Sequence, residues 1–86
     1  MHRGWVVSSD YRAAIETIKS ARINADVSQR ELARRLGKHP SFVNKIELLE
    51  RRMDVLEFIA VARALKIDPT ALLNSIIESM SENIEI

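Results

Sequence analysis

The stretch SQRELARRLGKHPSFVNKIE, residues 28–47, predicts two short helices joined by a tight turn, and it decides the fold of the chain. Ser28 and Glu31 form the pattern of a capping box, in which each side chain satisfies a backbone N–H that the first helical turn leaves without a partner. Gly37 then ends the first helix, because glycine adopts the left-handed conformation without the steric cost of a Cβ atom. The side chains that we expect to face inward are Leu32, Ala33 and Leu36.

The second helix of this stretch begins at a histidine and a proline. We expect His39 at the cap position and Pro40 at the first helical position, where the N–H that proline lacks is not needed. Apolar side chains then recur on one side of the helix and mostly polar ones on another. The first set is Phe42, Val43, Ile46 and Leu49, and the second is Ser41, Asn44, Lys45 and Leu48. One face therefore packs and the other is free to read a ligand, as in a helix-turn-helix unit.

Several residues of the stretch carry a resemblance to a known family. They are Ser28-Gln29, Ala33, Gly37, Val43, Ile46 and Glu47, and the match runs without a gap from about Ile15 to Pro69. At these positions the chain resembles the Cro and lambda-repressor-like helix-turn-helix family, also called the xenobiotic-response-element (XRE) family. The resemblance implies an all-α, compact five-helix lambda-repressor-like DNA-binding domain with the helix-turn-helix at helices 2 and 3. It also implies a transcriptional regulator, most simply a repressor, that places helix 3 in the major groove, and a structural salt bridge between Arg22 and Glu47.

The composition excludes most other functions. A chain of 86 residues, 47% of them hydrophobic, suits one small ordered domain. With no cysteine, two histidines and no phosphate-binding glycine loop, the chain offers no metal site, cofactor site or catalytic group. It also lacks an apolar run near the roughly 18 residues of a membrane span. We therefore expect a non-enzymatic, cytoplasmic, nucleoid-associated protein of a prokaryote or phage, with no cofactor, membrane partner or small-molecule substrate.

The net charge of +1 hides a division along the chain. Residues 1–52 carry eleven Lys and Arg against six Asp and Glu, a balance of +5, whereas residues 53–86 carry two against six, a balance of −4. A basic half is the electrostatic footprint of a polyanion-binding protein. Because uneven charge is also common on helical domains, the asymmetry supports DNA binding only together with the motif.

The segments around the motif complete a predicted domain of residues 10–80. Residues 1–9 predict a flexible N-terminal arm, in which residues 5–7 fold back onto the body or Arg3 reaches DNA. Residues 81–86 predict a frayed acidic tail. The expected caps are Ser9 or Asp10 for a helix ending near Asn24, Asp54 with Glu57 as its reciprocal partner, and Asp68 followed by Pro69. The expected core residues outside the motif are Tyr11, Ala14, Ile15, Ile18, Ala21, Val55, Phe58, Ile59, Ala62 and Leu65, with Lys66 closing the fourth helix.

The outer face of the second motif helix predicts the contacts with base pairs. Lysine favours guanine O6 and N7, and asparagine favours adenine N6 and N7. The expected base-reading residues are Ser41 and Lys45, then Asn44, with His39 and Pro40 at the edge. The resemblance places Gln29 where a helix N-terminus meets the DNA backbone, so we expect it to bind a phosphate. The other expected phosphate-binding residues are Arg51 and Arg52, and more weakly Arg30, Lys38 and Arg12. Arg34 and Arg35 are expected to be solvated surface.

Two positions depart from the family pattern. Leu49 stands where a glycine commonly ends the reading helix, and leucine resists positive φ, so the helix runs longer or the connector turns differently. Lys38 stands in the turn where the family often has an apolar residue, although a lysine stem can lie along apolar surface. The first departure bears on the placement of Arg51 and Arg52.

Dimerisation is expected, because one such domain makes too few contacts to select a site and two-fold dimers read two half-sites. The segment from Ile67 to Ile86 has no Lys or Arg and more aliphatic side chains than one packed face needs. The predicted dimer interface is Leu72, Leu73, Ile76, Ile77 and Met80, with the alternative that these residues only complete the monomer core. A second functional interpretation is an interaction module, similar to antitoxins and phage-type regulators, whose main partner is another protein.

Overall fold

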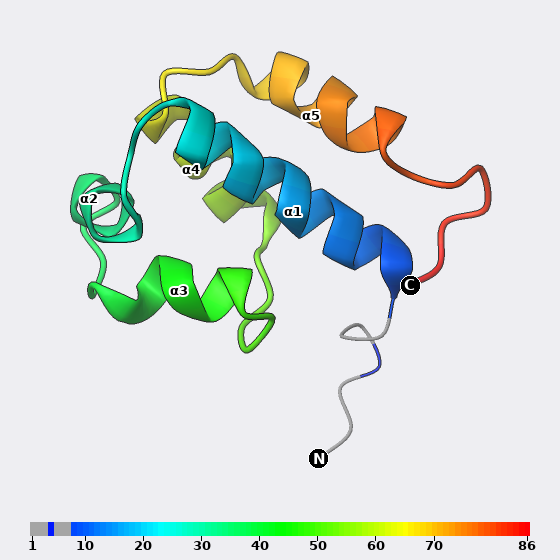
Figure 1. The fold of residues 1–86 in the computed structure, drawn as a ribbon, viewed down its shortest axis with the longest axis horizontal. Helices are drawn as coiled ribbons and strands as arrows, with labels where there is room; N and C mark the ends of the chain where they lie inside the picture. The colour runs from blue at the N-terminus through cyan, green and yellow to red at the C-terminus, as the bar shows by residue number, and fades with distance from the viewer. Residues whose placement is uncertain (1–3, 5–7) are drawn as a thin grey trace.

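The computed structural model describes residue 4 and residues 8–86, and the expectations for Arg3 and residues 5–7 fall outside this part of the chain. The helices that it contains are α1 (Ser9–Asn24), α2 (Gln29–Arg35), α3 (Ser41–Glu47), α4 (Val55–Ala64) and α5 (Pro69–Glu78) (Figure 1). The predicted all-α, five-helix fold is confirmed, with the helix-turn-helix at α2 and α3. Within the described residues, no helix has the length and apolarity needed to cross a membrane.

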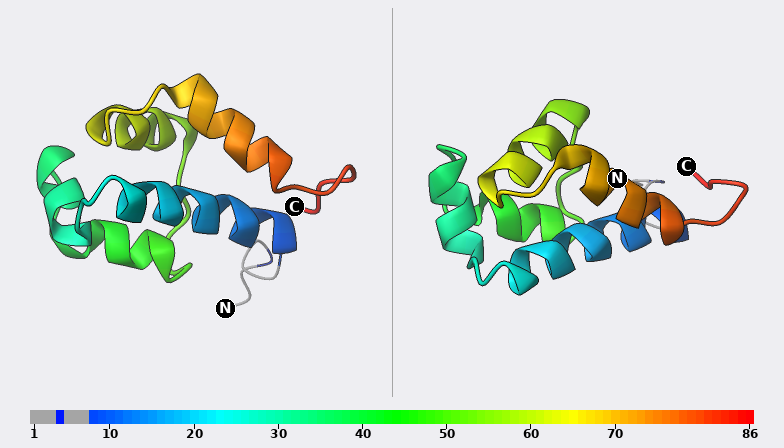
Figure 2. Two further views of the ribbon diagram at one scale, coloured as in Figure 1. Left: turned by 45° about the horizontal axis from the view of Figure 1, so that its top comes forward. Right: turned by 90° about the horizontal axis from the view of Figure 1, so that it is seen from above.

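Helix α1 is the central element of the fold. It packs against α3 on one side and α5 on the other, while α2 packs against both α3 and α4, and α4 packs against α5 (Figures 1 and 2). Because α3 and α5 lie on opposite sides of α1, the outer face of α3 points away from α5. The arrangement separates a surface on α2 and α3 from a surface on α4 and α5.

Helices α1, α2, α4 and α5 begin at side-chain caps. Asp54 and Glu57 form the predicted capping box, since Glu57 N–H donates to Asp54 Oδ1 at 2.7 Å and Asp54 N–H donates to Glu57 Oε1 at 3.0 Å. Asp68 caps α5 with Pro69 at the first position, also as predicted. The cap of α1 is Ser8, one residue before the range that we expected.

Four of the five helices end in the same backbone motif. The residue past each C-cap adopts a left-handed conformation, and the next N–H donates to the carbonyl five residues earlier, which is the Schellman arrangement. The left-handed residues are Asp26 (φ 60°), Gly37 (φ 67°), Leu49 (φ 62°) and Lys66 (φ 61°). The closing bonds are Val27 N to Arg22 O, Lys38 N to Ala33 O, Glu50 N to Lys45 O and Ile67 N to Ala62 O, at 3.2, 2.9, 2.8 and 2.9 Å.

Leu49 resolves the alternatives left open by the departure from the family pattern. Helix α3 ends at Glu47, and Leu49 itself adopts the positive φ for which glycine is favoured. A left-handed conformation costs a residue with a Cβ atom roughly 1–2 kcal/mol. The side chain of Leu49 packs half-buried against the core, and this burial offsets the cost.

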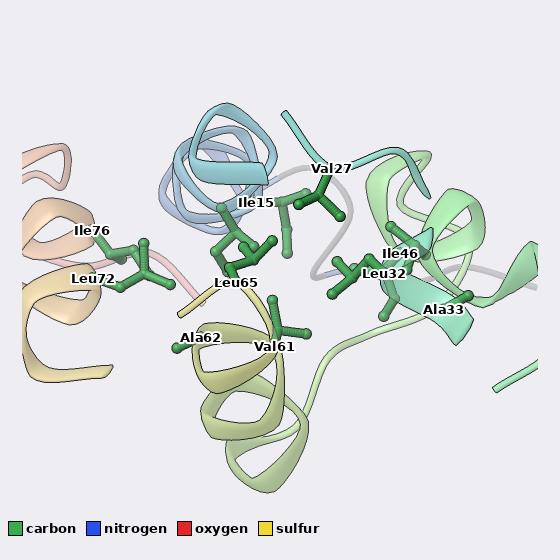
Figure 3. Close-up of a cluster of buried hydrophobic side chains, with 12 residues drawn as sticks. Ile15, Val27, Leu32, Ala33, Ile46, Val61, Ala62, Leu65, Leu72 and Ile76 are labelled. Carbon is green, nitrogen blue, oxygen red and sulfur yellow. The ribbon is translucent and has the colours of Figure 1, made fainter. Parts of the chain in front are cut away.

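The core joins all five helices. Figure 3 shows Ile15, Val61 and Leu65 between the α5 side chains Leu72 and Ile76 and the side chains of α2 and α3. The fully buried apolar residues are Ile15, Ile18, Val27, Leu32, Ala33, Val43, Ile46, Val61, Ala62, Leu65, Leu72 and Ile76. Leu36 of α2 is half-buried against this cluster.

The expectation for Val55 is wrong, and part of the predicted dimer interface is buried within the monomer. Val55 is 73% exposed, because the first turn of α4 lies at the edge of the core. Val61, which we did not predict as a core residue, is buried. Of the predicted dimer residues, Leu72 and Ile76 belong to the monomer core and Met80 is half-buried. Only Leu73 and Ile77 remain on the outer face of α5.

The expectation of a frayed tail is also wrong. The backbone N–H groups of Ser81 and Glu85 each donate to the carboxylate of Asp10 at 2.9 Å, so residues 81–86 lie against the start of α1. Asp10 is buried and belongs to the first turn of that helix. A hydrogen bond between residues more than 70 positions apart has no local sequence pattern, which explains why we did not expect it.

Glycine should have opposite effects at two of the left-handed positions. Lys66 is exposed, so Lys66→Gly removes the strain of a Cβ atom without losing packing, and we expect a gain of about 0.5–1 kcal/mol in the free energy of unfolding. Leu49→Gly removes the same strain together with a half-buried side chain, and we expect a loss of about 1 kcal/mol. Thermal and urea unfolding of both variants measures the difference. Equal shifts would contradict this account of the helix ends.

Candidate DNA-binding surface

Helix α2 begins at a side-chain cap, and backbone hydrogen bonds close its end, where the turn to α3 begins. Ser28 Oγ accepts from Glu31 N–H at 3.0 Å, so the first half of the predicted capping box is present. The reciprocal half is wrong, because the Glu31 carboxylate instead accepts from Arg34 and Arg35. At the other end of α2, Gly37 N–H donates to Arg34 O at 3.0 Å as part of the Schellman closure.

Arg34 and Arg35, expected to be solvated surface, are therefore ion-paired. Arg34 Nη2 and Arg35 Nε lie 2.6 and 2.9 Å from Glu31 Oε2. Hydrogen bonds from Arg34 and then Arg35 lower the pKa of Glu31 to about 2. Arg35 also donates to the carbonyl of Ala64 at 2.8 Å, which links α2 to the end of α4.

Helix α3 begins one residue later than predicted. Pro40 takes the N-cap position with helical φ and ψ, and Ser41 is the first helical residue. His39 still satisfies a free donor, because Ser41 N–H donates to His39 Nδ1 at 3.1 Å. The same ring nitrogen lies 2.9 Å from Ser41 Oγ, so two of the predicted base-reading side chains are held together before any ligand arrives.

The two faces of α3 differ as the sequence pattern predicts. Val43 and Ile46 are buried in the core. On the outer side Lys45 is exposed, and Ser41 and Asn44 are half-buried. These three side chains come from one helix of seven residues, so they form a single short surface.

A buried ion pair fixes the end of α3. Arg22 Nε donates to Glu47 Oε2 at 2.8 Å and Arg22 Nη2 donates to Glu47 Oε1 at 3.1 Å, with the two side chains 10% and 7% exposed. Arg22 Nη1 also donates to the Val27 carbonyl at 2.8 Å, and Gln29 Nε2 donates to Glu47 Oε1 at 2.8 Å. The network thus connects the end of α1, the start of α2 and the end of α3. Sequence reasoning named the pair but missed the roles of Val27 and Gln29.

Gln29 and Arg51, two of the expected phosphate-binding residues, make bonds within the protein. The Gln29 amide donates to Glu47, as described above. Arg51 forms a bidentate pair with Glu57 at 2.8 and 2.6 Å and lies over the Phe42 ring at 4.8 Å. Hydrogen bonding to Arg51 lowers the pKa of Glu57, so this pair also stabilises the cap of α4. Arg51 therefore joins α3 to α4 before it meets any phosphate.

The other cations lie on two flanks of α3. On the α2 side, Arg30, Lys38 and Pro40 line a hollow of about 400 Å³ together with Ser28, Arg34 and the ion-paired Glu31. The Lys38 ammonium lies 5.5 Å from the centre of the Phe42 ring, so its stem runs along apolar surface as expected for this turn position. On the other flank, the Arg52 guanidinium lies 5.6 Å from the centre of the Tyr11 ring.

Comparison with known proteins agrees with this geometry. A helix-turn-helix family model matches residues 18–72, more than half of the chain. An XRE-family like protein from Pseudomonas syringae pv. tomato str. DC3000 is 41% identical, with 85% of this chain and 89% of that chain covered and a TM-score of 0.78. The chain belongs to the XRE family of helix-turn-helix proteins.

A more distant structure shares the fold of this XRE-family protein. The clp gene regulator ClgR from C. glutamicum is 22% identical, with 86% of this chain and 96% of that chain covered and a TM-score of 0.73. A search of curated proteins gave no match. Family membership makes the chain a DNA-binding transcriptional regulator. Its described residues contain no group of three or more His, Cys, Asp or Glu that could hold a metal ion.

Removing Glu47 tests the network that holds α3. Glu47→Ala leaves the buried Arg22 guanidinium without its carboxylate, and loss of one partner of a buried pair costs about 3–5 kcal/mol. We expect a large drop in the melting temperature, since small domains have a total stability of only about 5–15 kcal/mol. Glu16→Ala, which removes an exposed carboxylate from α1, is the matched control. Melting curves that shift equally for both variants would show that the pair contributes little.

Proposed function

We propose that this XRE-family protein is a sequence-specific repressor that binds duplex DNA as a homodimer with α3 in the major groove. The observation that carries the proposal is the outer face of α3, where Ser41, Asn44 and Lys45 lie together while Val43 and Ile46 anchor the opposite face in the core. A major groove admits one α-helix and presents a different donor and acceptor pattern for each base pair. A repressor of this kind acts by occupying a DNA site that overlaps a promoter. It would act in the cytoplasm, where the DNA of a prokaryote or phage lies.

The base-reading side chains have separate roles in this proposal. Lys45 is exposed in the last turn of α3 and donates to guanine O6 or N7, and Asn44 makes a bidentate contact with adenine. Ser41 and His39, joined by their hydrogen bond, lie with Pro40 at the N-terminal edge of the helix. The Arg22–Glu47 network supports this assignment, because a reading helix must be held rigidly to place side chains within hydrogen-bonding distance of base edges.

The phosphate contacts come from both flanks of α3. Arg30 and Lys38 line the hollow beside α2, and Gln29 begins α2, whose free N–H groups and positive dipole end attract a phosphate. Arg52, and Arg51 with the part of its guanidinium that Glu57 leaves accessible, act across the groove. The +5 balance of residues 1–52 provides the long-range attraction, and the −4 balance of residues 53–86 orients the molecule on DNA.

An apolar surface on α4 and α5 supports the homodimer. It carries four exposed aliphatic side chains, Val55 (73% exposed), Leu56 (77%), Leu73 (46%) and Ile77 (56%). Next to them a groove of about 470 Å³ lies between α1, α4 and α5, and none of its lining residues belongs to α2 or α3. Its walls are apolar apart from Asp54 and Thr70. A second copy bound there leaves both α3 helices free.

The occupant that fits this groove best is another copy of the chain. A two-fold contact requires one surface to carry both the projections and the hollows that receive them. Val55 and Leu73 belong to both the exposed aliphatic set and the groove wall, so projections and hollow are continuous here. The same groove would admit an apolar helix of a different protein, which is the observation that favours the alternative function of an interaction module.

DNA binding should depend on Ser41 and Lys45. In a selection from a random DNA pool we expect one enriched motif, and Ser41→Ala with Lys45→Ala should weaken binding to it by about 10- to 100-fold with unchanged helix content. Arg63→Ala is the control, because it removes one positive charge from an exposed position on α4. Affinity should fall with salt, with a slope in log–log form of about 0.9 for each neutralised phosphate. Folded protein that retains no DNA at low salt would refute the repressor proposal.

Dimerisation should depend on Leu73 and Ile77. Wild-type protein should sediment with about twice the 9.8 kDa mass of the chain, and Leu73→Lys with Ile77→Lys should sediment as a monomer with the same helix content. Ile23→Lys, which introduces a charge at a similarly exposed isoleucine on α1, should leave the dimer intact. Because the two acidic halves repel one another, added salt should strengthen the dimer while it weakens DNA binding. A wild-type monomer that binds another protein through this surface would favour the interaction module.

A further inference from the structure

The segment after α5 turns back and binds the beginning of α1. Both carboxylate oxygens of Asp10 accept hydrogen bonds from it: Oδ1 from Ser81 N–H at 2.9 Å and Oδ2 from Glu85 N–H at 2.9 Å. The Ser81 hydroxyl adds contacts of 3.1 and 3.0 Å to the same two oxygens. Asp10 is 4% exposed, and residues of the tail hold its carboxylate through these hydrogen bonds.

The N-cap of α1 takes part in the same contact. Ser8, 1% exposed, accepts from Tyr11 N–H at 3.1 Å and donates its own hydroxyl to the Glu85 carbonyl. Ser9 N–H lies 3.3 Å from Glu85 Oε1. Hydrogen bonds from the backbone of Glu85 and Ser81 hold the pKa of Asp10 below its usual value, as expected for a carboxylate that accepts several N–H groups. The tail and the first turn of α1 therefore form one hydrogen-bonded unit.

Tyr11 links this unit to the connector between α3 and α4. Its hydroxyl accepts from Met53 N–H at 3.2 Å, and the Arg52 guanidinium lies 5.6 Å from the centre of its ring. Apolar side chains of the tail approach the same residue, since Tyr11 and Arg52 line a small hollow of about 80 Å³ with Met80, Ile84 and Ile86. Tyr11 is thus held between the tail and the connector.

We propose that residues 79–86 act as a strap that sets the position of the connector, with Asp10 as the positioning residue that keeps the strap closed. The closed strap fixes the first turn of α1 and the Tyr11 ring. The ring in turn fixes Met53 N–H and gives Arg52 the platform from which it meets a DNA phosphate. The last step rests on the proposed function, whereas the steps from Asp10 to Met53 stand on the hydrogen bonds and on the hollow that the tail shares with Tyr11.

The charge of Asp10 is what the strap requires. A carboxylate accepts from Ser81 and Glu85 at the same time, whereas an amide of the same shape presents an NH₂ group to one of these two donors and leaves it unsatisfied. Opening the strap also removes Met80, Ile84 and Ile86 from the hollow beside Tyr11. Arg52 then loses the support of the Tyr11 ring, so one phosphate contact weakens while α3 keeps its own anchors.

Asp10→Asn in the full chain tests the proposal. By amide hydrogen exchange we expect faster exchange at Ser81, Glu85 and Met53, with exchange in α3 unchanged. DNA binding should weaken about five- to ten-fold, and the salt slope should fall by about 0.9, the value for one phosphate. Glu82→Gln, which removes the charge of an exposed carboxylate in the same tail, should change neither measurement.

Two further variants separate the steps. Tyr11→Phe removes the acceptor of Met53 N–H but leaves Asp10 and the tail unchanged, so Met53 exchange and DNA affinity should change while Ser81 and Glu85 stay protected. Ser81→Pro removes the N–H and the hydroxyl that donate to Asp10, and it leaves the sequence of α1 unchanged. It should produce the effects expected of Asp10→Asn, so it replaces that variant if Asp10→Asn does not fold. Tail amides that exchange freely in the wild type would refute the strap.

The outcomes distinguish this proposal from the proposed function. If the tail opens in Asp10→Asn while Met53 exchange, DNA affinity and salt slope stay at wild-type values, the strap does not position the connector and the proposal is wrong. If the wild type binds no DNA, the repressor proposal fails. The exchange at Met53 then still decides whether the strap acts through Tyr11.

Discussion

The buried pair of Arg22 and Glu47 is the interaction on which the remaining structure depends. It connects the ends of α1 and α3 with the start of α2, and it does so in a fixed geometry because the guanidinium and the carboxylate meet through two hydrogen bonds. Val27 O and Gln29 Nε2 satisfy the remaining polar groups of the pair, so burial leaves no orphaned donor or acceptor there. The direction of α3, and with it the face that can meet DNA, follows from this contact.

A second principle is visible in the way the helices end. Three of the four left-handed positions carry a side chain, and the penalty is offset by apolar burial close by: Val27 is buried after Asp26, Ile67 packs after Lys66, and Leu49 packs through its own side chain. Helix α3 therefore ends after seven residues without a glycine, whereas α2, which has the same length, ends at Gly37. Short helices with fixed ends are suited to a motif whose two elements must keep one relative orientation.

The sequence predicts features that arise from neighbouring residues, and it fails where distant ones decide. The caps at Ser28, Asp54 and Asp68 follow from local chemistry and are present. The contact of the strap with Asp10 depends on partners more than 70 positions away, so no local sequence pattern predicts it. In the candidate site, the face of α3 follows from helical periodicity, and the Arg22–Glu47 pair from the family resemblance. The diversion of Gln29 to Glu47 and of Arg51 to Glu57 follows only from the packed structure.

The hydrogen bond between Ser41 and His39 determines which donor and acceptor groups the N-terminal end of α3 presents to a ligand. Ser41 N–H can only donate, so in the neutral ring Nδ1 is the acceptor and the ring proton lies on Nε2. In this tautomer the Ser41 hydroxyl, 2.9 Å from Nδ1, shares the single Nδ1 lone pair with the Ser41 N–H and keeps its own lone pairs for a ligand. In the proposed complex, a base edge at this position would meet an acceptor from the serine beside a donor from the histidine. In the same complex, that order would complement the adjacent N6 amino group and N7 of adenine.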